Sequence, residues 1–165
     1  LTDAGFTLEF ATSVLMVLMI CGAFGRIFGG ILGDRIGALP GYILMSLGQT
    51  VFVVWFPHLS SPTGIYLLAA FFGFTYSGVM SSILVCTRMM VSAKYGARAM
   101  SLTSFFGWIG MGLGGFLGGY FFDIYGDYSW AFTFAGIMGV INLVILSQFW
   151  LRIRNAKKGL EVLES

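Results

Sequence analysis

Five long apolar segments constrain the fold of this sequence more than any other feature. They cover about residues 10–32, 40–56, 64–90, 99–122 and 130–151, and short links rich in glycine and polar residues separate them. A helix rises about 1.5 Å per residue, so about 20 apolar residues cross a hydrocarbon layer of about 30 Å. The pattern predicts an all-α integral membrane protein with five transmembrane helices.

The composition excludes an ordinary water-soluble domain. Only 10% of the 165 residues are charged, whereas soluble domains carry about 25%. The 24 glycines lie largely within the apolar segments, although glycine costs about 1 kcal/mol relative to alanine in a helix interior. Membrane helices use small residues to bring their backbones together, so the glycines indicate close helix packing. The net charge of +2 gives no indication of a nucleic-acid partner.

Lysine and arginine outside the spans are confined to one side of this arrangement. The links after the first and third spans and the tail at 152–165 contain Arg35, Lys94, Arg98, Arg152, Arg154, Lys157 and Lys158. The segments on the other side contain acidic residues but no lysine or arginine. Because cytoplasmic loops of membrane proteins are enriched in these cations, we expect a cytoplasmic tail. We further expect a multi-pass protein of the plasma membrane, in contact with the lipid bilayer.

Two segments resemble sequences of the major facilitator superfamily. Residues 30–37 (GILGDRIG) resemble its cytoplasmic loop motif G-x-L-a-D-R-x-G-R-K, although Ala38 and Leu39 replace the two basic residues. Residues 119–132 resemble the junction of helices 11 and 12 in monocarboxylate and oxalate/formate-type members. The resemblance implies a partial major facilitator helical bundle, helices 8 to 12 of twelve, whose partner is the N-terminal half of the same polypeptide.

The resemblance also implies a conformational latch in this motif. Asp34 would accept hydrogen bonds from a neighbouring helix N-terminus or pair with an arginine, and so hold one conformation of the transporter. Arg88, near the end of the third span, is the partner that the superfamily suggests. The motif also includes Gly30, Arg35 and Gly37. In the alternative interpretation these residues form a solvated turn bent at Gly37, and Arg88 extends to the lipid headgroups.

Arg26 is the charge that lies deepest in the predicted membrane. The 16 uncharged residues 10–25 give only about 24 Å of helix, so the first span includes Arg26 or ends just before it. A charge at that depth normally faces a cavity or a partner rather than lipid. Monocarboxylate and oxalate/formate-type transporters carry on helix 8 an arginine that binds the substrate carboxylate, and the resemblance implies this role for Arg26. In the alternative, Arg26 pairs with a carboxylate elsewhere or extends towards the cytoplasm.

Polar residues within the other spans are further candidates for a substrate site. Tyr76, Ser77 and Ser81 form the preferred patch, because they lie near the middle of the third span, where such transporters bind substrate. Gln49 and Asn142 are polar residues of the second and fifth spans. Serine and threonine also bond to carbonyls of their own helix, so an ordinary role is the alternative.

The fourth span contains a series of glycines that has two possible interpretations, a dinucleotide-binding loop or a helix-packing face. Its members are Gly110, Gly114, Gly115, Gly118 and Gly119. Residues 110–115 formally satisfy the dinucleotide-binding pattern G-x-G-x-x-G, but the strand, turn and helix that this pattern requires are not predicted here. The four-residue spacing instead predicts a helix-packing face. Gly25, Gly29 and Gly33 repeat that spacing in the first span.

These features favour a transporter over an enzyme. The single histidine, His58, provides no metal cluster or proton relay, so we expect no metal and no cofactor. We expect a secondary transporter that moves a small solute, a monocarboxylate or similar organic anion, by alternating access. One alternative is a transporter of a neutral solute or drug in which Arg26 is structural. A second is a membrane scaffold that transports nothing.

Overall fold

The computed structural model describes residues 1–2 and 5–164, and side chains as far as residue 156. Its long helices are α1 (Leu8–Ile36), α2 (Ala38–Val53), α3 (Pro62–Met90), α4 (Gly96–Tyr125) and α5 (Ser129–Glu164). Two short 3₁₀ helices, η2 (Phe56–His58) and η3 (Ala93–Tyr95), lie in the links. Five helical segments are long and apolar enough to cross a membrane, which confirms the predicted fold class. The last helix continues well past the expected end of its span at residue 151.

Local sequence signals explain where the helices begin and end. The Thr7 hydroxyl caps α1 by accepting a hydrogen bond from the Phe10 N–H (3.2 Å), and Ser61 caps α3 in the same way. Gly37 separates α1 from α2 at a φ of +99°, and Gly126 ends α4 at a φ of +73°. Glycine suits both positions because residues with a Cβ rarely adopt positive φ.

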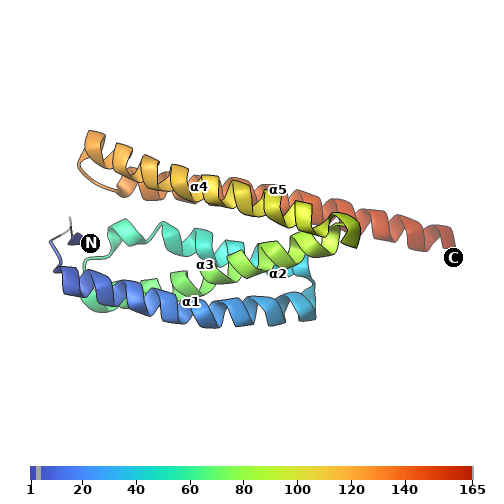
Figure 1. The fold of residues 1–165 in the computed structure, drawn as a ribbon, viewed down its shortest axis with the longest axis horizontal. Helices are drawn as coiled ribbons and strands as arrows, with labels where there is room; N and C mark the ends of the chain where they lie inside the picture. Colours follow the sequence, from blue (N-terminus) through green and yellow to red (C-terminus); the bar gives the residue numbers. More distant parts are fainter. Residues whose placement is uncertain (3–4, 165) are drawn as a thin grey trace.

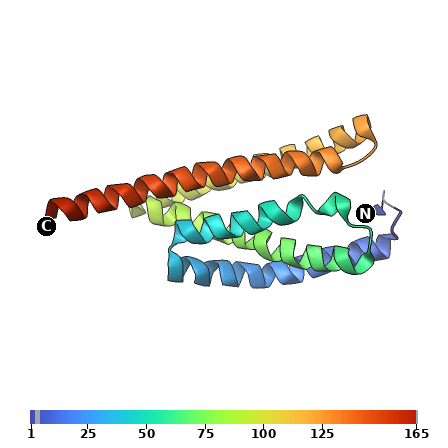
Figure 2. The same cartoon turned by 180° about the vertical axis from the view of Figure 1, so that it is seen from behind.

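The helices form two groups. In Figures 1 and 2, α1, α2 and α3 pack together, and α4 and α5 run alongside them as an antiparallel pair. The links from α1 to α2 and from α3 to α4 lie at one end of the bundle, and the C-terminal part of α5 extends beyond that same end.

Glycines bring α1 and α3 into very close contact. The two helices run parallel, and a Cβ on Gly25 would collide with the Phe74 backbone. A Cβ on Gly29 would lie 2.9 Å from the Gly78 carbonyl oxygen, and one on Gly73 would collide with the Leu18 backbone. The predicted packing role of the glycine repeat in the first span is therefore confirmed for Gly25 and Gly29.

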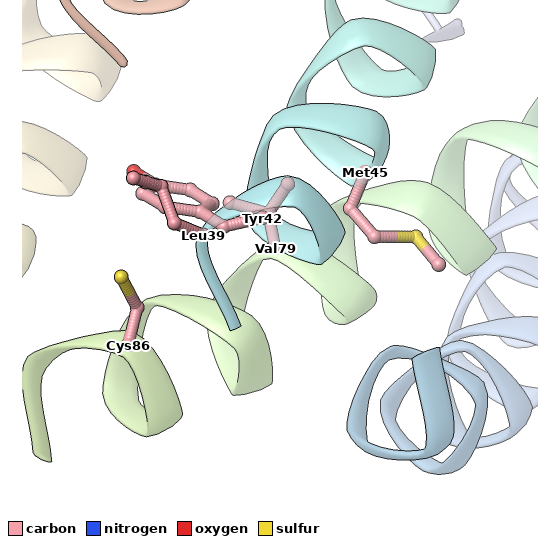
Figure 3. Close-up of a cluster of buried hydrophobic side chains, with 5 residues drawn as sticks. All are labelled: Leu39, Tyr42, Met45, Val79 and Cys86. Carbon is pink, nitrogen blue, oxygen red and sulfur yellow. The ribbon is translucent and has the colours of Figure 1, made fainter. Parts of the chain in front are cut away.

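A buried cluster joins α2 to α3. Leu39, Tyr42 and Met45 of α2 meet Val79 and Cys86 of α3 in this cluster (Figure 3). Each of the five is at most 8% exposed, so the cluster excludes lipid and water from between the two helices.

The α2–α5 contact also depends on small residues. A Cβ on Gly139 would lie 2.5 Å from the Thr50 hydroxyl, and one on Gly136 would lie 2.7 Å from a Val54 methyl group. These two glycines let α5 approach α2, although the sequence analysis did not single them out.

In contrast, α4 is loosely held, and its glycines have no close neighbour on the other described helices. A Cβ on any of the five predicted packing glycines, Gly110, Gly114, Gly115, Gly118 and Gly119, would meet nothing within 4 Å. Within the described part of the chain, α4 has no buried residue. Its few ties are a Thr87–Thr103 hydroxyl contact of 3.3 Å to α3 and aromatic contacts to α5. The α4 glycines therefore do not form a packing face with any other described helix.

Gly25→Ala is expected to destabilise the protein by about 1 kcal/mol or more, even though alanine is the better helix former. The added Cβ would meet the Phe74 backbone, which has no alternative rotamer, and overpacking of this kind typically costs about 1–3 kcal/mol. The midpoint of thermal unfolding in detergent measures the effect. Gly30→Ala is the control, because a Cβ there meets nothing within 4 Å. Equal midpoints for the two variants would contradict this packing.

Candidate functional site

Arg26 combines a fixed backbone with a free side chain. Its neighbour Gly25 is in tight contact with α3, and its own carbonyl oxygen accepts a hydrogen bond from the Ser81 hydroxyl (3.2 Å). The Arg26 side chain is exposed. Among the described side chains, no carboxylate lies within salt-bridge distance of its guanidinium group. The structure therefore positions the Cα of Arg26 rigidly and leaves its charge uncompensated by the described part of the chain.

The other predicted substrate residues fall into two different environments. Ser77 is only 9% exposed and lies at the α1–α3 contact, where its hydroxyl would be 2.5 Å from a Cβ on Gly22. Ser81 also lies there, bonded to the carbonyls of Gly78 and Arg26. Both hydroxyls therefore lie at the packed α1–α3 contact, and their role in substrate binding stays a prediction.

Tyr76 lies apart from these serines. Its ring stacks on Phe72 of the same helix, with the centroids 5.7 Å apart, and Phe72 in turn meets Phe56 edge to face. The structure therefore brings Arg26 and Ser81 together but leaves Tyr76 in an aromatic series on α3. The predicted patch is not a single site in the described chain.

A groove between α2, α3, α4 and α5 has a volume of about 590 Å³. Its walls are mostly apolar or small, and its glycines are Gly110, Gly114, Gly118 and Gly139. Its polar lining consists of Ser46, Gln49, Thr50 and Asn142. None of the four predicted substrate residues lines this groove.

Asn142 organises the polar side of the groove. Its side-chain NH₂ donates to the Ser46 hydroxyl at 3.4 Å, and it also interacts with the Tyr42 hydroxyl. Ser46 is 2% exposed. A buried polar group needs such a partner, so the network stabilises the α2–α5 contact. In the sequence, the only signal for this grouping is that Gln49 and Asn142 are amide residues within apolar spans.

The residues of the predicted latch lie at one end of the bundle. Asp34, Arg35 and Arg88 are all exposed, and Gly37 makes the turn after α1. The α1–α3 register that joins Arg26 to Ser81 brings Asp34 to the level of the last turns of α3, which include Arg88. In the conformation described, however, no ion pair joins the two side chains. The latch therefore stays a prediction.

No metal centre was found. Over residues 1–2 and 5–156, whose side chains are described, no group of three or more His, Cys, Asp or Glu side chains could hold a metal ion.

The sequence is similar to that of a known membrane transporter. The chain is 30% identical, over 100 residues, to the riboflavin transporter MCH5 of Saccharomyces cerevisiae; the match covers 59% of this chain and 19% of that protein. The chain thus spans only a small part of the length of this relative. No solved structure gives a significant match. Residues 1–163 match the sequence profile of the Major Facilitator Superfamily, and the chain therefore belongs to this superfamily.

Proposed function

We propose that this chain is part of a secondary transporter that moves a small organic anion, such as a monocarboxylate, by alternating access. Membership of the superfamily and the similarity to a transporter support the general activity. The observation that carries the anionic substrate is the exposed guanidinium of Arg26 within an apolar helix. We further propose that the protein lies in the plasma membrane. The end of the bundle that carries the α1–α2 and α3–α4 links would face the cytoplasm, because these links contain lysine and arginine.

A guanidinium group at this depth in a membrane is stable in only a few environments. A charged side chain near the bilayer centre costs about 2.5–3.5 kcal/mol on insertion scales, so it is retained where it faces water or an anion. The planar group matches a carboxylate through two parallel hydrogen bonds, which gives both affinity and orientation. Because α3 holds the backbone of Arg26, only its side chain would have to be ordered to bind such an anion. The fourth helix carries no lysine within its span, so a single negative charge suits the site better than two.

A neutral solute is the second candidate. It is favoured by the similarity to a riboflavin transporter, because riboflavin carries no net charge at neutral pH. In that case Arg26 would pair with a carboxylate of another part of the polypeptide and stabilise the bundle. A membrane scaffold without transport activity is the third possibility, and uptake of solute into proteoliposomes separates it from both transporters.

We also propose that the groove between α2, α3, α4 and α5 receives a further apolar helix of the same polypeptide, from its other half. Three features support this: the cavity of about 590 Å³, its mostly apolar walls, and the absence of any described neighbour within 4 Å of a Cβ on the α4 glycines. Where glycines of α1 and α3 do have a partner, the helices are in tight contact. The same residue type on α4 offers an equally close approach to a helix.

Our third proposal is that Asp34 and Arg88 form the latch, at the end of the bundle where α1 and α3 end. Asp34 would pair with Arg88 in one conformation of the transport cycle and separate in the other. Their similar level along α1 and α3 and the exposure of both side chains support it.

Arg26→Ala is expected to weaken binding of a monocarboxylate by about tenfold to a hundredfold, because one charge-assisted bidentate contact is lost. Arg26→Lys should retain part of the affinity, since it keeps the charge without the planar fork. Binding to the purified natural protein and uptake into proteoliposomes measure the two effects, with Arg98→Ala as a control outside the spans. Equal monocarboxylate binding by wild type and Arg26→Ala would exclude the role. Uptake of riboflavin that is insensitive to Arg26→Ala would favour the neutral solute.

Gly114→Leu is expected to lower the unfolding midpoint of the natural polypeptide, because the new side chain would fill space that another helix occupies. Gly112→Leu is the matched control: it lies on the same helix, meets nothing within 4 Å, and does not line the groove. If both variants melt at the same temperature as wild type, the groove does not hold a helix.

Asp34→Asn is expected to shift the populations of the two transport conformations and to change the transport rate, whereas Asp34→Glu should shift them less. Distances between spin labels at the two ends of the bundle report the populations. If the residues act as a pair, Arg88→Gln produces the same shift, and the double variant adds nothing to it. Populations and rates that are unchanged in Asp34→Asn would remove the latch.

A further inference from the structure

One end of the bundle carries an unusual concentration of exposed cations. Six of them are described as exposed: Arg35, Arg88, Lys94, Arg98, Arg152 and Arg154. They come from the end of α1, the end of α3, η3, the start of α4 and the last part of α5, which all lie at the same end in Figure 1. We call this set the basic end. Among the described side chains there, Asp34 is the single acidic one.

The cations of the basic end are available to bind an external anion. Within the part of the chain whose side chains are described, none forms a salt bridge with a carboxylate. Two of them instead lie beside aromatic rings. The Arg154 guanidinium is 5.4 Å from the centre of the Trp150 ring, and the Lys94 ammonium is 5.6 Å from that of Tyr95.

The geometry of α5 sets the depth of these groups in the membrane. The helix has 36 residues and is therefore about 54 Å long, whereas the hydrocarbon layer is about 30 Å thick. About 20 residues from Ser129 reach the far boundary close to Trp150, and tryptophan favours that interface. Arg152 and Arg154 follow directly, at the depth of the lipid headgroups.

We propose that the basic end binds the headgroups of anionic phospholipids in the adjacent leaflet. A cluster of at least four cations directly beyond a transmembrane helix attracts anionic lipid, at about 1 kcal/mol for each lysine or arginine near the surface. Guanidinium groups also donate paired hydrogen bonds to phosphate oxygens. The aromatic rings next to Arg154 and Lys94 favour a lipid over a soluble anion, because they hold both cations beside the hydrocarbon boundary.

Arg152 and Arg154 allow this surface to be tested apart from transport. Neither belongs to the proposed substrate site or latch, and both are exposed. The natural protein, purified in detergent, would be mixed with equal amounts of phosphatidylserine and phosphatidylcholine, and the retained lipids counted by native mass spectrometry. The variants are Arg152→Gln with Arg154→Gln, the same pair changed to lysine, and Asp123→Asn at the opposite end.

Wild type is expected to retain phosphatidylserine preferentially, and the double glutamine variant to lose about tenfold to thirtyfold of this preference. The double lysine variant and Asp123→Asn should keep most of it, and salt near 0.5 M should weaken it in wild type. Equal preference in wild type and the glutamine variant would overturn the proposal. So would loss of bound phosphatidylserine in millimolar inorganic phosphate at constant ionic strength, which would indicate a site for free phosphate. If the glutamine variant fails to fold, an absence of salt dependence in wild type would overturn it.

Discussion

The close approach of α1 and α3 is the contact on which the rest of the structure depends. Apolar side chains gain little by leaving lipid for another helix, so association in a membrane requires dense packing and short polar contacts. Glycines on both helices provide this, and the Ser81 hydroxyl reaches across to the Arg26 carbonyl because the backbones are so near. The α2–α3 cluster around Met45 and Val79 then adds the third helix.

The α1–α3 contact also fixes the position of the Arg26 backbone. A charged residue on a mobile helix would move with it towards the headgroups, whereas here the neighbouring Gly25 ties the helix to α3. The side chain remains exposed on a rigid helix. Rigid presentation of a single cation suits the proposed recognition of a carboxylate, since only the side chain would have to be ordered on binding.

The α4–α5 pair has a different character. Its ties to the first three helices include the α2–α5 contact through Gly136 and Gly139, the hydrogen bond from Asn142 to Ser46, and a hydroxyl contact between Thr87 and Thr103. The groove next to α4 remains open in the described chain. The described bundle is therefore tight around α1, α2 and α3 and open beside α4.

The sequence by itself determined the fold class and the positions of the charges. Helix length and hydropathy specify five spans, and the loop motif at 30–37 led to the superfamily that the comparisons confirm. Both are local properties, so no knowledge of helix packing is needed.

Only the tertiary structure decided which small and polar residues meet a partner. The same four-residue glycine spacing occurs on α1, where α3 covers it, and on α4, where no described helix does. Ser77 and Ser81 likewise lie at the α1–α3 contact, which their positions in the sequence did not reveal. The physical reason is that a helix presents several faces to its surroundings, and the face that becomes buried depends on neighbours distant in the sequence.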